Sequence, residues 1–119
     1  VSGKFQLDNY SLSSAEDSSG ISSDSIQITL SVSGKAIAIN GKGGGPIEAF
    51  VSAINEYFNE SISVSDYHQH SVTSGADAKA AAFIELTSNG KNEWGAGMDG
   101  NTVKASFQAI ISGLNKLIT

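Results

Sequence analysis

The sequence contains no cysteine, which excludes disulfide scaffolds, thiolate nucleophiles and cysteine-based zinc sites. Basic residues are also scarce: seven Lys and Arg stand against twelve Asp and Glu, giving a net charge of −5. A protein that binds nucleic acid needs clustered positive charge to displace counterions from phosphates, so we expect no nucleic-acid partner. Apolar runs stay well short of the roughly 18 residues that cross a bilayer, so we also expect no membrane partner.

The chain does contain 13 glycines, and its hydrophobic content of 39% is enough for a modest core. A length of 119 residues is typical of one domain, so we expect residues 1–119 to form a single domain. Glycine and serine are frequent, which favours many turns and strands.

The dominant pattern is an internal repeat, because a shift of 56 residues places the second half of the chain on the first. The shift aligns turns and apolar positions alike: Gly34 with Gly90, Gly41 with Gly97, Gly44 with Gly100, Ile28 with Ile84, and Leu30 with Leu86. With one residue of slippage, Tyr10 aligns with Tyr67. The sequence therefore predicts two copies of one supersecondary unit, about residues 4–60 and 61–119, each too small to bury a core alone.

The first copy has the pattern of three strands followed by a helix. Alternating apolar residues predict strands at residues 5–13, 25–33 and 36–40. The polar stretch 14–24 predicts a surface loop, and the glycines from Gly41 onward are expected to break the third strand. Pro46 suits the first turn of a helix, and apolar residues then recur with helical spacing until Asn59.

The second copy repeats this order. Its strands are expected at residues 61–74, 77–88 and 91–98, with a turn near Ser74-Gly75. A break with a capping residue at 99–101 precedes a second helical stripe over 103–117. We therefore expect an α+β fold of two pseudo-repeated βββα units, layered so that each sheet buries one face under its helix.

Two motifs point to chemistry but lack the residues that the chemistry requires. The run Gly41–Pro46 has no Lys followed by Ser or Thr at the helix start, so it predicts a tight turn rather than a phosphate loop. Asp66, His68 and His70 alternate on a predicted strand and share a face, but no fourth metal ligand follows at sensible spacing. Serine never occurs in a Gly-x-Ser-x-Gly elbow. We therefore assign no catalytic residue and no metal site.

A candidate ligand site lies on the strands of the second copy. The small residues between Ala76 and Ala82 would let a ligand or another backbone approach the sheet closely. Tyr67 stands on the preceding predicted strand. Together these residues predict a shallow apolar pocket with a polar rim.

Several spaced motifs in this region also carry a family resemblance. They are Asp66-Tyr67-x-x-His70, Gly75-x-Asp77-Ala78-x-Ala80-Ala81-Ala82, Trp94-Gly95-x-Gly97, Ala105-Ser106-x-x-Ala109, and the turn Gly43-x-Gly45-Pro46-Ile47. In this order they resemble the C-terminal regulatory domain of 2-isopropylmalate synthase. The resemblance covers about residues 26–117, and its Trp-Gly-x-Gly version is similar to the actinobacterial and fungal branch.

The resemblance implies a homodimeric regulatory domain that binds L-leucine and transmits feedback inhibition of leucine biosynthesis to the catalytic domain of the same polypeptide. The parent enzyme is an acyltransferase that condenses acetyl-CoA with 2-oxoisovalerate in a barrel that depends on a divalent metal. We expect that barrel to be absent from this chain, so the domain itself would need no cofactor and catalyse nothing. The family's role implies a cytoplasmic location, or a mitochondrial one in a fungus.

Carried over by position, the leucine site of the family falls on six residues of this chain: Ile47, Glu48, Val64, Tyr67, Ser71 and Ala78. Glu48 and Ser71 are polar where the family commonly has small apolar residues. The helix-start turn adds Gly43, Gly45 and Pro46. We expect backbone groups at this turn and near Val64 and Tyr67 to hold the charged head of the amino acid.

Three alternatives remain open from the sequence. The same fold in citramalate synthase responds to isoleucine, so the effector could be isoleucine instead of leucine. The chain could also be a dimerisation module whose pocket is unused. A small metal-dependent enzyme built on Asp66, His68 and His70 is the last alternative.

Overall fold

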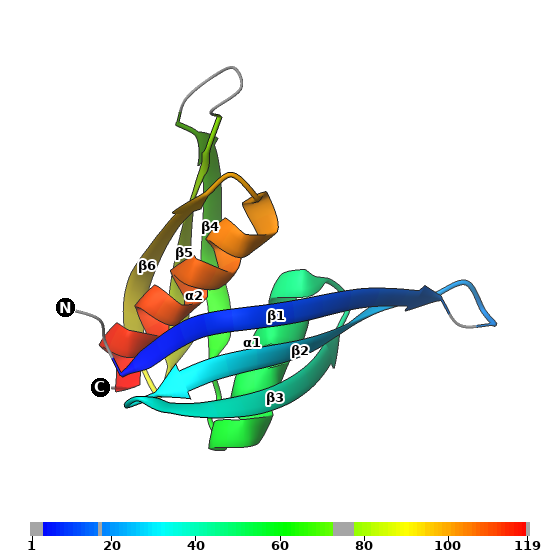
Figure 1. Cartoon of the computed structure of the whole chain (residues 1–119), viewed down its shortest axis with the longest axis horizontal. Helices are drawn as coiled ribbons and strands as arrows, with labels where there is room; N and C mark the ends of the chain where they lie inside the picture. The colour runs from blue at the N-terminus through cyan, green and yellow to red at the C-terminus, as the bar shows by residue number, and fades with distance from the viewer. Residues whose placement is uncertain (1–3, 17, 73–77, 119) are drawn as a thin grey trace.

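The computed structural model describes residues 4–16, 18–72 and 78–118, which form six strands and two helices (Figure 1). The elements follow in the order β1 (Phe5–Glu16), β2 (Ser22–Val32), β3 (Lys35–Gly43), α1 (Pro46–Phe58), β4 (Ser63–Ser71), β5 (Ala80–Ser88), β6 (Lys91–Asp99) and α2 (Thr102–Ile118). Both sheets are antiparallel, with strand orders β1-β2-β3 and β4-β5-β6. The predicted α+β fold of two βββα units is therefore confirmed.

The repeat extends to the backbone of the tight turns. The β2–β3 hairpin turns through Ser33 and Gly34, which have φ values of 52° and 86°. The β5–β6 hairpin turns through Asn89 and Gly90, at 52° and 79°. Two successive positive φ angles give a two-residue turn whose twist matches that of the flanking strands. The predicted turns thus join equivalent strand pairs in both units.

The hydrophobic core is continuous across the two units because their helices meet. α1 covers one face of the first sheet, and α2 covers one face of the second (Figure 1). Phe50 of α1 and Phe107 of α2 are fully buried and stack with their ring centroids 4.5 Å apart. The sheets add alternating side chains that are also fully buried: Ile28, Leu30, Ile84 and Leu86. Each unit therefore covers apolar surface that the other would expose to water.

Close contact between helix and strand explains the repeated glycines. A Cβ atom on Gly41 would collide with the carbonyl oxygen of Ala49 in α1. A Cβ atom on Gly97 would collide with the carbonyl oxygen of Ala105 in α2. The glycine-rich run after Gly41 therefore serves helix packing, in agreement with its interpretation as a turn rather than a phosphate loop.

Both helices begin with the predicted signals, and α1 also ends with one. Pro46 lies in the first turn of α1, and Asn59 ends that helix in the left-handed conformation with φ 55°. At the start of α2, Asn101 Oδ1 accepts hydrogen bonds from the backbone N–H of Val103 at 2.9 Å and of Lys104 at 3.1 Å. This side chain satisfies amides that the first turn of a helix leaves unpaired.

Several expected strand boundaries are wrong, beginning with those of the first unit. The stretch 14–24 was expected to be a loop, but β1 continues to Glu16, and Ser14 pairs with Asp24 of β2. The hydroxyl of Ser14 also donates to Asp24 Oδ1 at 2.6 Å. This end of the hairpin is exposed to solvent and its side chains are polar. The sequence therefore lacks the alternation of apolar and polar residues by which a strand is predicted. β3 likewise runs through Gly41 to Gly43, because backbone pairing with β2 needs no side chains.

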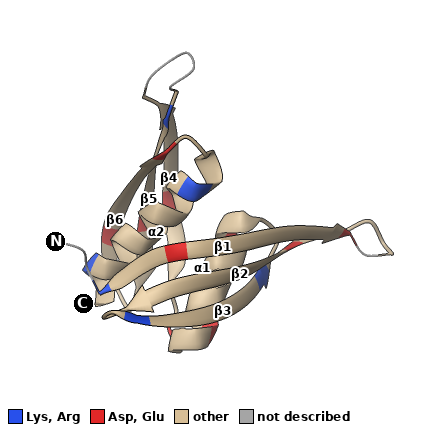
Figure 2. Ribbon diagram, viewed as in Figure 1, with Lys and Arg blue, Asp and Glu red and all other residues tan. Residues whose placement is uncertain are grey.

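In the second unit, β4 ends at Ser71 and β5 begins at Ala80, so both are shorter than predicted. The turn expected near Ser74-Gly75 and the motif residues Gly75 and Asp77 lie outside the described residues. Charged side chains are spread over both units (Figure 2). Neither of the helices in the described ranges is long and apolar enough to span a membrane.

Candidate ligand pocket between the two units

A pocket of about 610 Å³ lies between α1 of the first unit and β4 of the second. Its lining residues are Ile47, Glu48, Val51, Ser52, Asn55, Ser63, Val64 and Tyr67. Four of the six predicted leucine-site residues are among them: Ile47, Glu48, Val64 and Tyr67. The structure therefore brings together side chains that the sequence places in different copies of the repeat.

Helical spacing and a pair of hydrogen bonds set the width of the pocket. Ile47, Val51 and Asn55 follow one another at intervals of four residues, so they line one face of α1. Asn55 Nδ2 donates to the carbonyl oxygen of Ile62 at 2.9 Å, and Asn55 Oδ1 accepts from the Ile62 N–H at 2.8 Å. These bonds tie the segment leading into β4 to α1.

A β-bulge orients the tyrosine at the other side of the pocket. The pairing of β4 with β5 shifts register between Val64 and Asp66, and Asp66 Oδ1 accepts a hydrogen bond from the Tyr67 N–H at 2.8 Å. β1 has the same shift between Leu7 and Asn9, so the bulge belongs to the repeat. The bulge re-aims the side chain that follows it, as bulges near functional sites commonly do.

The Tyr67 hydroxyl reaches the second helix. It donates to Gln69 Oε1 at 2.6 Å and lies 3.2 Å from Ser106 Oγ of α2. Ser106 Oγ in turn donates to the carbonyl oxygen of Thr102, at 3.1 Å, in the first turn of α2. A smaller hollow of about 190 Å³ adjoins the ring, lined by Pro46, Ile47, Tyr67, Thr102, Val103 and Ser106. Tyr67 therefore contacts α2 and lines the same hollows as residues of α1.

The repeat predicts a matching pocket between α2 and β1, but that place is filled. Phe107 stands in α2 where Val51 stands in α1, and Tyr10 stands in β1 where Tyr67 stands in β4. The Tyr10 and Phe107 rings pack edge to face with centroids 4.9 Å apart. Val51 is smaller than Phe107 and leaves open the space that Phe107 fills in the other unit. Of the two equivalent places in the repeat, the one between α1 and β4 is therefore a pocket and the one between α2 and β1 is filled.

The other two predicted pocket residues lie elsewhere. Ser71 is exposed at the end of β4, opposite Ala80, and Ala78 is exposed just before β5. Neither lines the pocket of a single chain. Sequence reasoning in turn did not assign Val51, Ser52, Asn55 and Ser63 to the site. The helical spacing from Ile47 could have found Val51 and Asn55, because both share its face of α1.

Of the predicted helix-start turn, Pro46 lines the smaller hollow beside Tyr67, whereas Gly43 and Gly45 line neither that hollow nor the pocket. Gly45 is the N-cap of α1, and its carbonyl accepts a hydrogen bond from the Ala49 N–H at 2.9 Å. In the described part of the chain, no side-chain hydrogen bond caps this end of the helix. A Cβ on Gly43 would crowd the backbone of Glu48 and Ala49, so this position requires glycine. Because Pro46 has no N–H, the amides of Ile47 and Glu48 are the ones left for water or a ligand in this turn.

Asp66, His68 and His70 point to a different surface. His68 Nε2 lies 3.2 Å from Asp66 Oδ2, which agrees with the expected shared face. The His68 ring stacks on Trp94 with centroids 5.8 Å apart, and His70 lies 6.0 Å from the Phe83 ring. Among residues 4–16, 18–72 and 78–118, no three His, Cys, Asp or Glu side chains are placed to hold a metal ion. The alternative of a metal-dependent enzyme therefore has no structural support.

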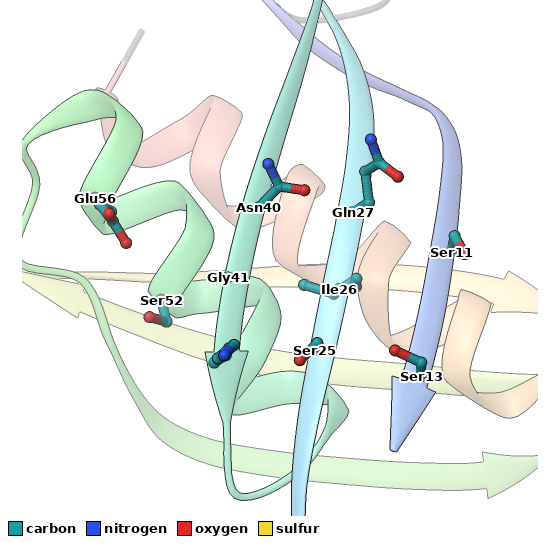
Figure 3. A pocket seen from close by; sticks show the side chains of 10 residues that line it. Ser11, Ser13, Ser25, Ile26, Gln27, Asn40, Gly41, Ser52 and Glu56 are labelled. Carbon is teal, nitrogen blue, oxygen red and sulfur yellow. The ribbon is translucent and has the colours of Figure 1, made fainter. Parts of the chain in front are cut away.

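A second large hollow, of about 550 Å³, lies on the first unit around β2 and β3 (Figure 3). Its lining is mostly polar: Ser11, Ser13, Ser25, Ile26, Gln27, Asn40, Gly41, Lys42, Ser52 and Glu56. It has no aromatic residue, and Ile26 is its one large aliphatic residue, unlike the pocket between α1 and β4. The latter pocket is therefore the better candidate for an apolar ligand.

Comparison with known proteins agrees with this architecture. Residues 1–118 match the family described as the LeuA allosteric (dimerisation) domain. The chain is 40% identical over 93 residues to the 2-isopropylmalate synthase of Parafrankia sp., covering 78% of this chain and 16% of that protein. It is 32% identical over 120 residues to the enzyme of Schizosaccharomyces pombe, covering 96% and 20%, and 37% identical over 102 residues to that of Mycobacterium ulcerans, covering 86% and 18%.

These relatives include actinobacterial and fungal proteins, as the resemblance implied. The chain spans about a fifth or less of the length of each of them. With nearly its whole length matched, this chain belongs to the LeuA allosteric (dimerisation) domain family, the regulatory domain of 2-isopropylmalate synthases.

Proposed function

We propose that the chain is the regulatory domain of a 2-isopropylmalate synthase, that it binds L-leucine in the pocket between α1 and β4, and that it dimerises. The observation that carries the proposal is the pocket itself, where Ile47, Val64 and Tyr67 converge from two units. In the full polypeptide, leucine binding would shift the domain between states and so inhibit a catalytic domain outside this chain. The proposal assigns this domain no cofactor and no catalytic residue, and places the enzyme in the cytoplasm or, in a fungus, the mitochondrion.

The apolar walls suit a leucyl side chain. Ile47 and Val64 are half-buried, and Val51 is 8% exposed, so a ligand between them would remove further apolar surface from water. Burying the isobutyl group contributes roughly 3 kcal/mol at about 0.8 kcal/mol per carbon. Tyr67, which is 38% exposed, offers an aromatic face at the pocket rim.

The polar groups around the pocket suit the head of an amino acid. The first-turn amides of α1 lie at the positive end of the helix dipole, where a carboxylate is favoured. β4 is an edge strand, so half of its backbone groups form no hydrogen bond within the sheet. Its carbonyl groups near Val64 and Tyr67 would accept hydrogen bonds from the ammonium group of leucine. Glu48 adds a carboxylate at the rim.

Ser71 and Ala78 belong to the proposed leucine site only if two protomers form that site together. They lie at the far end of the β4–β5 hairpin, outside the pocket of one chain. We propose that they contact leucine when a second protomer completes the site. Ala78→Phe would then weaken leucine binding only in the dimer.

Calorimetric titration of the chain with leucine, isoleucine, valine, leucinamide and zinc tests the function. Leucine should bind, and valine should bind about 10- to 200-fold more weakly because one methylene is missing. Leucinamide should bind roughly 10- to 100-fold more weakly, because a charge-assisted hydrogen bond to the carboxylate is lost. Tighter binding of isoleucine would favour the citramalate synthase alternative, and heat from zinc alone would favour a metal site. No binding of any amino acid would leave a dimerisation module.

A further inference from the structure

The small hollow beside Tyr67 lies where equivalent parts of the two units meet. Its lining includes two pairs of residues that the shift of 56 residues superimposes: Pro46 with Thr102, and Ile47 with Val103. Both pairs belong to the first turns of α1 and α2, so this space of about 190 Å³ lies between the starts of the two helices. Tyr67 and Ser106 complete its lining. We call it the inter-helix hollow.

Tyr67 stands between the inter-helix hollow and the larger ligand pocket. Tyr67 and Ile47 line both spaces, whereas Val51 and Val64 line only the pocket and Val103 lines only the hollow. The side chains of Tyr67 and Ile47 therefore form the wall that separates the two spaces. If the Tyr67 ring turned away, the spaces would join, and the apolar lining at Val103 would become part of the pocket.

The repeat shows what holds the equivalent tyrosine ring in the first unit. Tyr10 packs edge to face against Phe107, with ring centroids 4.9 Å apart. Beside Tyr67, the place of Phe107 is taken by Val51, and among the described residues no aromatic ring packs against that of Tyr67. Tyr67 therefore lacks the ring contact that fixes Tyr10, and its position depends on the hydrogen bonds of its hydroxyl.

Ser106 departs from the repeat at the place where α2 meets Tyr67. The first unit has Phe50 there, which is fully buried and stacks on Phe107. Ser106 is only 3% exposed, so its hydroxyl lies at a core position that the other unit fills with an aromatic ring. A buried hydroxyl destabilises a core unless it forms hydrogen bonds. The partners of Ser106 therefore decide what this serine contributes.

The Ser106 hydroxyl is the group that can donate a hydrogen bond to the Tyr67 oxygen. Tyr67 donates its single hydroxyl proton to Gln69 Oε1 at 2.6 Å, so its oxygen is left as an acceptor for Ser106 Oγ at 3.2 Å. The Ser106 proton has one other acceptor within reach, the carbonyl oxygen of Thr102 at 3.1 Å. That carbonyl also accepts the backbone N–H four residues later in α2, so it does not depend on the serine hydroxyl.

We propose that Ser106 is a positioning residue of the ligand pocket: its hydrogen bond to the Tyr67 hydroxyl holds the tyrosine ring as a wall and so limits the size of side chain that the pocket accepts. This inference rests on the proposed binding of leucine. A fixed wall favours leucine, because the ring does not have to be ordered when the ligand binds. A released ring can turn into the inter-helix hollow and leave room for a larger apolar side chain, such as that of phenylalanine.

Titration calorimetry with leucine and with phenylalanine tests this role. Ser106→Ala removes the donor and Tyr67→Phe removes the acceptor, and each should weaken leucine binding by roughly 3- to 10-fold. Phenylalanine should lose less affinity or gain some, so the ratio of leucine to phenylalanine affinity should fall by about tenfold in both variants. Because both substitutions break the same bond, the double variant should bind leucine no more weakly than Tyr67→Phe alone.

Ser112→Ala and Tyr10→Phe are the matched controls. Ser112 lies in the same helix as Ser106, where its Oγ accepts a hydrogen bond from the Ala96 N–H at 3.3 Å, and Tyr10 occupies the place of Tyr67 in the other unit. Both control variants should keep the leucine affinity and the affinity ratio of the parent chain. Circular dichroism should show the parent's secondary structure in every variant.

The outcomes separate this inference from the proposed function. A parent chain that binds leucine, with variants that weaken binding additively or keep the parent's affinity ratio, overturns the role of Ser106 and leaves leucine binding standing. A parent chain that binds no leucine overturns both. If Ser106→Ala does not fold, Tyr67→Phe still decides the question, because it keeps the ring and removes only the hydroxyl; an unchanged affinity ratio in that variant overturns the inference.

Discussion

Replacing Val51 by phenylalanine should close the pocket by giving the first unit the side chain of the second. Phe107 occupies the equivalent place in α2, where its ring packs on Tyr10 with centroids 4.9 Å apart. In Val51→Phe, the new ring would extend toward Tyr67 and occupy the space that Ile47 and Val64 border. Because the fold already contains this pair in its other half, we expect the variant to remain folded.

The size of the effect follows from the apolar contact that leucine would lose. A leucyl side chain contains four carbons beyond Cα, and burying them contributes roughly 3 kcal/mol. At 1.4 kcal/mol per tenfold, Val51→Phe should weaken leucine binding by about 100-fold or more. Isothermal titration calorimetry measures this change directly.

Ile21→Phe provides the matched control. Ile21 is 65% exposed between β1 and β2, away from the pocket, so the same aromatic substitution there should leave leucine binding unchanged. Circular dichroism of both variants should show the parent's secondary structure. A folded Val51→Phe chain that binds leucine within threefold of the parent would refute the pocket assignment.

Two further substitutions test the packing that holds the site. Asn55→Ala removes both hydrogen bonds to the Ile62 backbone and should lower the free energy of unfolding by about 1–3 kcal/mol, measured by urea denaturation; an unchanged midpoint would show that these bonds do not hold β4 to α1. Gly97→Ala should destabilise by about 1–3 kcal/mol because its Cβ meets the Ala105 carbonyl. Gly44→Ala, with no atom near its Cβ, is the control, and equal thermal shifts for the two would contradict the close-packing explanation.

Much of the fold could be predicted because each pattern that indicates a strand, a turn or a helix occurs twice in the sequence. Pro46 and Asn59 mark the ends of α1, and the shift of 56 residues carries the same strand–turn–strand–helix order into the second unit. The predicted strand boundaries were wrong where the side chains give no indication that the backbone pairs with a neighbouring strand. The outer end of the β1–β2 hairpin, including Ser14 and Asp24, is exposed and polar, so it resembles a loop in sequence.

The site was predicted only in part, for a physical reason. Ile47 and Val64 could be assigned from a resemblance, and the structure places them in one pocket. The pocket exists because Val51 is smaller than Phe107. This difference in size creates a pocket only because Val51 of α1 faces β4 and Phe107 of α2 faces β1. A sequence shows the two residues but not the strands they face. The helical spacing from Ile47 could have placed Asn55 on the same face of α1, but its hydrogen bonds to the Ile62 backbone could not be predicted, because they join it to the other unit.

The most direct test of the central claim is to locate bound leucine by NMR. An isotope-labelled chain titrated with leucine gives amide chemical-shift changes residue by residue. The account predicts the largest changes at Ile47, Glu48, Val64 and Tyr67, with little change at Gln27 and Ser25 in the polar hollow of the first unit. Saturable shifts confined to that hollow or to the outer face around Trp94, or no shifts at millimolar leucine, would contradict it.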